Sequence, residues 1–257
     1  MELRAVIFDV DGTLAETEEL HRRAFNEAFA RFGLPWRWDR ETYRRLLATT
    51  GGKERLRRHA RDVGMAEAGL PESLVAEIHA FKNARYHALV ESGGVALRPG
   101  IAELIGDALA AGLRLGIATT TSPSNVDTLL RATLGPGWRS QFAAVAAGDQ
   151  VPRKKPAPDV YHAALADLGL DGDDCLALED SRNGVLAAVG AGIPVAVTPS
   201  LYTAGEDFSG AVAVLGPDAP PPALAAVVSW HAAAPRVPGG RPGGRPHPAG
   251  GAAGLSR

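Results

Sequence analysis

A short apolar run at residues 5–7 leads directly into the sequence FDVDGT at residues 8–13. A β-rich apolar segment that ends in Asp and Gly predicts a central strand followed by a turn. In open α/β sheets, ligands bind in the crevice beyond the carboxyl ends of such strands. We therefore expect an α/β sheet in which Asp9 faces a crevice.

Asp9 and Asp11 place two like charges close together on this turn. A shared divalent cation, or protonation of one carboxyl group, relieves the repulsion at least cost, and both arrangements suit a phosphate ester. Mg²⁺ would offset the charge of Asp9 and of the substrate, so that Asp9 could attack phosphorus and form an aspartyl-phosphate. Asp11 could protonate the leaving group and later take a proton from water or an alcohol. Taken alone, most such strings are surface turns.

Polar groups that can bind phosphate follow later in the chain. The apolar run at residues 113–118 is followed by Thr119 and Thr120, whose hydroxyl groups and backbone amides can bind phosphate oxygens. Lys155 precedes the sequence PAPD, where a helix is expected to begin near Asp159. The lysine can neutralise phosphate charge.

A third apolar run, residues 175–178, leads into Glu179 and Asp180. Acids at a strand end before a turn that contains Gly complete a site for a hard cation. Because every acid falls at a predicted strand end, and the groups occur together, a set of unrelated surface turns is improbable.

In this order, the segments resemble the four motifs of the haloacid dehalogenase superfamily, which are matched by Asp9 with Asp11, Thr119, Lys155, and Glu179 with Asp180. The resemblance implies that Asp9 is the nucleophile and Asp11 the acid and base. It implies that Thr119 and Lys155 hold the phosphate. It also implies that Asp9, Asp180 and the Asp11 backbone carbonyl bind Mg²⁺, while Glu179 tunes or holds the metal shell. An Asp two residues after the nucleophile points to phosphatases and phosphomutases within the superfamily.

The spacing of apolar residues divides the chain into three parts. Residues 16–92 have helical periodicity, with a first apolar stripe that ends at Gly33, and we interpret them as an all-helical cap. Residues 1–15 and 93–231 hold short strands that alternate with helices, which predicts parallel βαβ units. The expected fold is therefore α/β, with a Rossmann-like parallel sheet core of the haloacid dehalogenase type and an inserted helical cap. Residues 232–257, rich in Ala, Pro and Gly, are expected to form a disordered tail.

The cap is expected to select the substrate, because a lid over the crevice excludes water and contacts the non-reacting part of the substrate. The candidate substrate-binding residues are Glu16, Thr17, His21, Gly52, Lys53 and Lys82, with Thr120 from the sheet. The backbone amides of residues 51–52, together with Lys53, Arg55 or Lys82, could hold a second phosphate. For each residue taken singly, the alternative is a solvated helix surface or a favourable charge at a helix end.

Longer strings resemble the CbbY-like sugar phosphatases, near relatives of β-phosphoglucomutase. They stand at residues 8–26, 49–56, 96–105, 117–126, 146–149, 154–161 and 177–184. CbbY proteins dephosphorylate xylulose 1,5-bisphosphate, an inhibitor of the Calvin-cycle enzyme Rubisco, to xylulose 5-phosphate. The resemblance implies the same reaction here. The alternatives are a sugar phosphomutase, a broad sugar-phosphate phosphatase and a non-catalytic phosphosugar-binding module.

Composition fits an enzyme that acts on a small molecule. The formal net charge of -2 gives no electrostatic reason to expect nucleic acid as a partner. The single cysteine, Cys175, excludes an internal disulfide framework and indicates a reducing compartment. No apolar run approaches about 20 residues, and we expect neither a membrane segment nor a signal peptide. The expected protein is a cytoplasmic monomer that uses Mg²⁺ on a sugar phosphate.

Overall fold

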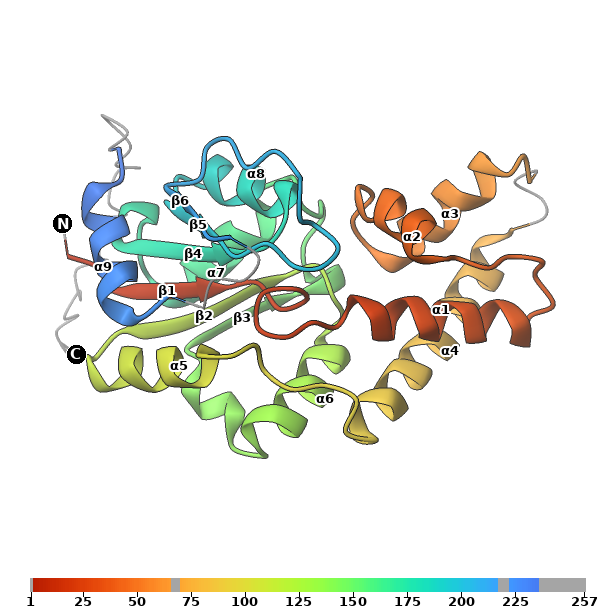
Figure 1. Cartoon of the computed structure of the whole chain (residues 1–257), viewed down its shortest axis with the longest axis horizontal. Helices are drawn as coiled ribbons and strands as arrows, with labels where there is room; N and C mark the ends of the chain where they lie inside the picture. Colours follow the sequence, from red (N-terminus) through yellow and green to blue (C-terminus); the bar gives the residue numbers. More distant parts are fainter. Residues whose placement is uncertain (1, 66–69, 217–221, 236–257) are drawn as a thin grey trace, which may run out of the picture.

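The computed structural model describes residues 2–65, 70–216 and 222–235. Within these ranges the strands form one parallel sheet in the order β3-β2-β1-β4-β5-β6 (Figure 1). The strands are β1 (Ala5–Phe8), β2 (Arg114–Thr119), β3 (Ala144–Ala147), β4 (Cys175–Glu179), β5 (Val195–Val197) and β6 (Ala213–Val214). Strands β1 to β5 are almost wholly buried because helices cover both faces, which is why they stand in the sequence as short uninterrupted apolar runs.

The register of the central strands places their carboxyl ends side by side. Phe8, the last residue of β1, pairs with Ile117 of β2 and with Leu178 of β4. The N–H of Asp9 donates to the Leu178 carbonyl over 3.0 Å, so the ladder continues as far as the first acid. The polar residues that follow β1, β2 and β4 therefore emerge at one edge of the sheet.

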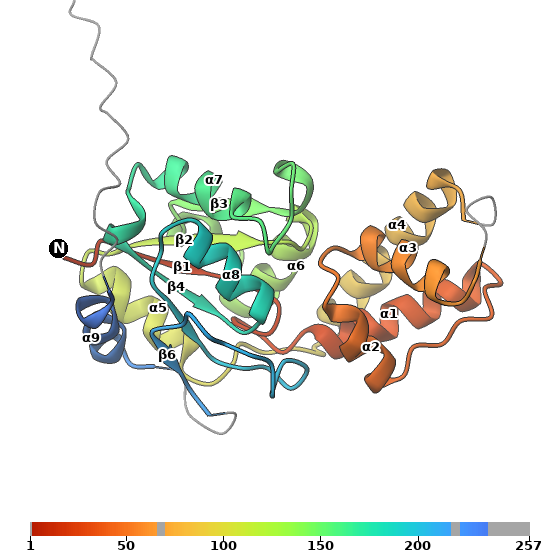
Figure 2. The ribbon, with the colours of Figure 1, turned by 90° about the horizontal axis from the view of Figure 1, so that it is seen from above.

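Helices on the two faces of the sheet complete the core. They are α5 (Ile101–Ala110), α6 (Pro123–Leu134), α7 (Asp159–Leu168), α8 (Arg182–Gly190) and α9 (Leu224–Ala233), with short 3₁₀ helices η2 (Trp138–Gln141), η3 (Gly148–Gln150) and η4 (Gly172–Asp174). Alternate residues of β1 point to opposite faces. Val6 and Phe8 pack with α5, α6 and α9, whereas Ala5 and Ile7 pack with α7 and α8. Figures 1 and 2 show the two helical layers on either side of the sheet.

The helices that follow β1 pack around an aromatic core of their own. They are α1 (Glu18–Arg31), α2 (Arg40–Leu47), α3 (Gly52–Asp62) and α4 (Glu72–Glu91), and we call them the cap helices. The Trp38 ring lies 4.8 Å from the Phe25 ring and 4.7 Å from the Phe29 ring, measured between centroids. Figure 1 shows that the cap helices lie beyond the carboxyl ends of the strands.

Two linkers join the cap helices to the sheet, and they lie side by side. The N–H of Arg98 donates to the Leu14 carbonyl over 2.8 Å, and Ala15 forms an antiparallel bridge with Leu97. The Arg98 guanidinium donates to three further main-chain carbonyls, those of Gly12, Thr198 and Pro199. The linkers are thus bonded both to each other and to the edge of the sheet.

Some element ends differ from the sequence pattern. The apolar runs at residues 193–197 and 211–215 predict longer strands than β5 (Val195–Val197) and the edge strand β6 (Ala213–Val214). Helix α9 reaches Ala233, two residues into the expected tail, and residues 236–257 of that tail lie outside the described residues. Among the residues that the structure describes, no helix has the length and apolar character needed to cross a bilayer. The division into core, cap and tail stays a prediction.

Candidate active site

A pocket opens between the carboxyl edge of the sheet and the cap helices. From the sheet side it is lined by Asp9, Asp11, Thr119, Thr120, Lys155 and Asp180, and from the cap side by Glu18, His21, Gly52, Arg55, His79 and Lys82. Glu179 does not line the pocket and is fully buried at the end of β4. The fold therefore brings together, at one site, the acids that follow β1 and β4, which lie far apart in the sequence.

Lys155 holds Asp9 through a buried ion pair. Its Nζ donates to Asp9 Oδ1 at 2.7 Å, to the Ala118 carbonyl at 2.8 Å and to Glu179 Oε1 at 2.6 Å. These bonds use all the ammonium hydrogens. Burial alone would lower the pKa of Lys155, but the two carboxylates outweigh burial and raise it, so the lysine stays charged. Burial raises the pKa of Asp9 to about 7, although Lys155 opposes that shift.

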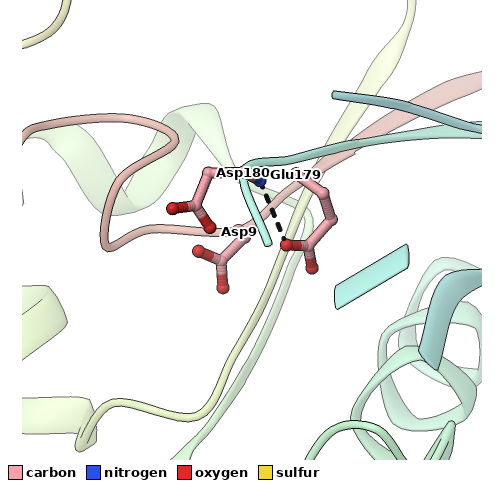
Figure 3. Close-up of side chains that lie close together, drawn as sticks. All are labelled: Asp9, Glu179 and Asp180. Carbon is pink, nitrogen blue, oxygen red and sulfur yellow. Dashed lines mark hydrogen bonds between the residues drawn. The ribbon is translucent and has the colours of Figure 1, made fainter. Parts of the chain in front are cut away.

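Three buried carboxylates form a candidate metal site beside Lys155. Oxygen atoms of Asp9, Glu179 and Asp180 lie within 4.8 Å of one another (Figure 3). Burial, together with the charges of Asp9 and Glu179, raises the pKa of Asp180 well above its usual range. Two like charges 4 Å apart repel by about 4 kcal/mol at an effective dielectric constant of about 20, and one ammonium group does not neutralise three acids. A hard divalent cation such as Mg²⁺ fits this set of oxygen donors.

Glycines allow these carboxylates to approach the backbone closely. A Cβ atom on Gly12 would overlap Asp180 Oδ2, and Gly12 has a φ of +87°, which favours glycine. A Cβ atom on Gly184, near the start of α8, would overlap the carboxylate of Glu179. The glycine after each pair of acids in the sequence is therefore needed for the acids to converge.

Glu179 accepts a hydrogen bond that the sequence analysis missed. The Tyr161 hydroxyl, on α7, donates to Glu179 Oε1 at 2.6 Å, the same oxygen that accepts from Lys155. Burial and the charge of Glu179 raise the pKa of Tyr161 well above its usual value, so the hydroxyl keeps its proton. Oε2 of Glu179 accepts from the Asp180 N–H at 3.3 Å, the dashed line in Figure 3.

The Asp11 side chain lies outside the three-carboxylate group and contacts the cap side. Its Oδ1 accepts from the Thr17 hydroxyl at 2.6 Å and from His21 Nε2 at 3.1 Å. Burial would raise the pKa of Asp11, but the contact with His21, the hydrogen bond from Thr17 and the charge of Lys82 lower it to about 2. The predicted role of Asp11 as a metal ligand therefore depends on its main-chain carbonyl.

Lys82 on α4 extends this chain of contacts. Its Nζ lies 2.7 Å from His21 Nδ1. When the lysine donates to Nδ1, the neutral imidazole carries its proton on Nε2 and donates that proton to Asp11. Burial lowers the pKa of Lys82 to about 7, and burial with the charge of Lys82 lowers the pKa of His21. The cap side thus presents a cation whose charge is lost as the pH rises through neutrality.

The remaining predicted substrate-binding residues fall into two groups. Gly52, the first residue of α3, and Thr120, just after β2, both line the pocket. Glu16 and Lys53 do not line it. Glu16 Oε1 lies 3.8 Å from Arg98 Nε in the linker. Lys53 Nζ lies 3.1 Å from Oδ2 of the exposed Asp149 in η3.

Arg55, which the sequence analysis weighed as one of three cations for a second phosphate, lines the pocket. Its Nη1 donates to the Tyr43 hydroxyl at 2.9 Å, and that hydroxyl donates to Glu18 Oε2 at 2.7 Å. The buried Nε of Arg55 has no hydrogen-bond partner among the described residues. Arg55 is three residues after Gly52 on α3, and this spacing places both residues on the same face of the helix. Lining residues that the sequence analysis did not select include Glu18, His79, Asn125 and Lys154.

Known proteins resemble this chain in both sequence and fold. Residues 3–192 match the haloacid dehalogenase-like hydrolase family. The chain is 56% identical over 211 residues to Protein CbbY of Rhodobacter capsulatus, which covers 82% of this chain and 92% of that protein. The crystal structure of CbbY from Rhodobacter sphaeroides in complex with phosphate is 54% identical, with a TM-score of 0.79, and covers 83% of this chain and 93% of that chain.

A mutant of the Rhodobacter sphaeroides protein in complex with xylulose (1,5)-bisphosphate is 53% identical, with a TM-score of 0.78, and covers 83% of this chain and 93% of that chain. These matches confirm the family and the fold that the motifs predicted. The chain belongs to the haloacid dehalogenase-like hydrolase family and is therefore a hydrolase with a parallel α/β sheet core.

Proposed function

We propose that this chain is a Mg²⁺-dependent phosphatase that converts xylulose 1,5-bisphosphate to xylulose 5-phosphate through an aspartyl-phosphate on Asp9. The observation that carries the proposal is the buried contact of 2.7 Å between Asp9 and Lys155, beside Glu179 and Asp180. A carboxylate held in this way can act as a nucleophile toward an anionic phosphorus because positive charge offsets its own. The similar mutant protein of Rhodobacter sphaeroides, which was crystallised in complex with xylulose (1,5)-bisphosphate, supports the choice of substrate.

Asp9 and Asp11 would divide the chemistry between them. Asp9 Oδ forms the bond to phosphorus while the sugar oxygen leaves, and Asp11 donates a proton to that oxygen. Water then attacks the aspartyl-phosphate while Asp11 takes its proton, which restores both side chains. The depressed pKa of Asp11 suits the second step directly, since the carboxylate is the base. In the first step, the negative charge of a bound phosphate ester raises the pKa of Asp11 and favours its acid form.

Other groups would bind the reacting phosphate. Thr119 and Thr120 at the end of β2 offer hydroxyl groups and amides, and Lys155 offers positive charge. Mg²⁺, held by Asp9, Asp180 and the Asp11 carbonyl with Glu179 behind them, would neutralise carboxylate and phosphate charge. The proton chemistry stays with Asp11, whose contacts with Thr17 and His21 orient it.

The second phosphate would bind on the cap side of the pocket. Arg55, Lys82 and the backbone amides at the start of α3 face the same space, and the buried Nε of Arg55 lacks a protein partner among the described residues. A substrate with two phosphates can contact both walls at once. Lys53 and Glu16 would contribute only indirectly, because neither lines the pocket.

A phosphate-release assay tests the proposal. Xylulose 1,5-bisphosphate, ribulose 1,5-bisphosphate and a set of sugar monophosphates are compared side by side at millimolar Mg²⁺. We expect xylulose 1,5-bisphosphate to have the highest kcat/KM, and we expect EDTA to abolish activity and Mg²⁺ to restore it. Equal rates on all esters would contradict this substrate choice and indicate a broad sugar-phosphate phosphatase. If none of the esters released phosphate, the non-catalytic binding module would be favoured.

A sugar phosphomutase is the second candidate. The contacts of Thr17 and His21 with Asp11 favour it, because these residues match positions found in mutase relatives. The two reactions differ in whether a sugar hydroxyl or water attacks the phosphorylated Asp9. Incubation with a hexose 1-phosphate and a bisphosphate primer separates them, since a mutase yields isomerised monophosphate without inorganic phosphate.

The composition also suggests where the proposed enzyme acts and what it binds. We propose a cytoplasmic monomer whose partner is a small sugar phosphate rather than nucleic acid or a membrane. Size-exclusion chromatography with light scattering measures the mass, and a dimer would contradict this part of the proposal.

A further inference from the structure

Tyr161 on α7 is a buried side chain to which the proposed reaction gives no role. It is fully excluded from solvent and packs among apolar residues such as Ile7 and Ala164. Yet its hydroxyl donates to Glu179 Oε1 at 2.6 Å. This bond satisfies the buried hydroxyl and also places a donor on a carboxylate beside the candidate metal site.

Several contacts hold the Glu179 carboxylate. Its Oε1 accepts from both Tyr161 and Lys155 at 2.6 Å, whereas within the described part of the chain Oε2 accepts only the longer bond of 3.3 Å from the Asp180 N–H. On its other side the carboxylate packs against Gly184, where even a Cβ atom would overlap it. The two short bonds to Oε1 therefore determine the orientation of the carboxylate.

The same tyrosine also contacts Lys155. The lysine Nζ lies 5.2 Å from the centroid of the Tyr161 ring, within the range of a cation–π contact. Lys155 donates its three ammonium hydrogens to Asp9, Glu179 and a main-chain carbonyl. If Glu179 turned away, Lys155 would lose one of the contacts that orient it toward Asp9. Tyr161 therefore supports the positions of both Glu179 and Lys155.

We propose that Tyr161 is a positioning residue: its hydroxyl fixes Glu179, and through Glu179 it fixes Lys155 and the carboxylate cluster that faces the metal. The part of this inference that concerns turnover rests on the proposed phosphatase function, whereas the part that concerns metal binding does not. Hydrogen-bond partners of groups at a metal site affect metal affinity or activity by about 10- to 100-fold when they are removed.

Tyr161→Phe tests the proposal, because it keeps the ring and removes only the hydroxyl. We expect Mg²⁺ binding by the full chain, measured by titration calorimetry, to weaken by about tenfold with the number of sites per chain unchanged. We expect kcat to fall by about tenfold or more while KM changes less than about threefold, since Tyr161 does not line the pocket.

Tyr202→Phe is the matched control. The Tyr202 hydroxyl also donates to a carboxylate, Glu19 Oε2 at 2.5 Å, but neither residue lines the pocket. We expect its Mg²⁺ affinity and kcat to stay within about twofold of the unmodified protein. A Tyr161→Phe variant that matches this control would overturn the proposal. A lower number of sites at unchanged affinity would also overturn it, because that outcome reports partial unfolding rather than a misplaced carboxylate.

The two arms separate this inference from the proposed function. If the unmodified protein released phosphate from no ester, the phosphatase proposal would fail, and the calorimetric comparison would still decide the role of Tyr161. If the unmodified protein were active and both arms matched the control, only the role of Tyr161 would fail.

Discussion

The two walls of the pocket are built in different ways. On the sheet side, Lys155 uses all its hydrogens on fixed acceptors, and Glu179 is enclosed by Lys155, Tyr161 and the backbone. On the cap side, polar groups are less fully paired. Among the described residues, the buried side-chain polar atoms that lack a hydrogen-bond partner all lie in or beside the cap helices, apart from Thr13 Oγ1. They are Trp38 Nε1, Arg55 Nε, His59 Nδ1 and Tyr86 Oη.

This difference indicates a division of labour. The sheet side is organised by strand register and short bonds before any ligand arrives, as a site for bond making and breaking requires. The cap side keeps unpaired donors that a ligand can engage. Changes to the sheet side should therefore affect every substrate, whereas changes to the cap side should affect the choice among substrates.

The largest effect is expected from Asp9→Asn. We expect phosphate release to fall by at least about a thousandfold on every ester, because an amide cannot act as the nucleophile. Circular dichroism should show an intact fold, since the amide keeps the shape of the side chain. Asp127→Asn, on α6 outside the pocket, is the control. Residual activity above about a tenth would contradict the nucleophile role.

Asp11→Asn should distinguish leaving groups. We expect about a hundredfold loss of kcat on a sugar phosphate and less than about tenfold on an activated aryl phosphate, whose leaving group needs no proton. The measurement is kcat for both substrates with one enzyme preparation. Equal losses would mean that Asp11 serves the metal or the loop rather than proton transfer.

Arg55→Gln should affect the cap side alone. We expect KM for xylulose 1,5-bisphosphate to rise by about tenfold, with little change for an aryl phosphate that has no second phosphate. Arg57→Gln is the matched control, because that arginine pairs with Glu72 at 2.5 Å and does not line the pocket. The contrast between the two walls would break if Arg55→Gln slowed both substrates equally.

The smallest effect is expected from pH. Burial lowers the pKa of Lys82 to about 7, so the lysine loses its charge between about pH 6 and 8. We expect KM for a bisphosphate to rise by about fivefold across that range, and the rise should be smaller in Lys82→Met. The folded chain also gives up this proton before the unfolded chain does, so the unfolding free energy should rise with pH from about 7 to 10.5. Equal pH profiles of KM for the two proteins would exclude Lys82.

Sequence reasoning reached the sheet side because its signals are local. Strands buried on both faces stand out as apolar runs, and the carboxyl ends of parallel strands meet, so Asp9, Thr119 and Glu179 could be grouped without coordinates. The same reasoning could not predict that the Asp11 side chain points toward the cap helices. It depends on where α1 places His21 in space.

On the cap side, neighbours in sequence separate in space. Lys53 and Arg55 are two positions apart on α3, so they point in different directions, and only Arg55 lines the pocket. Which face of a helix turns toward the sheet depends on packing against α4, which the pattern of one sequence does not reveal. Tyr161 was missed for a related reason, because in a buried helix its position matches that of any core aromatic residue.

The paired linkers beside Arg98 have a consequence for the timing of the reaction. Because the outgoing and returning chains are bonded to each other, a rotation of the cap helices about this joint would move them as one body. Such a rotation would carry His21 away from Asp11 and leave Asp9 and Lys155 undisturbed. An open molecule would then retain its nucleophile without the contact that orients Asp11, so that hydrolysis of the phosphorylated side chain would wait until the cap helices had closed over it again.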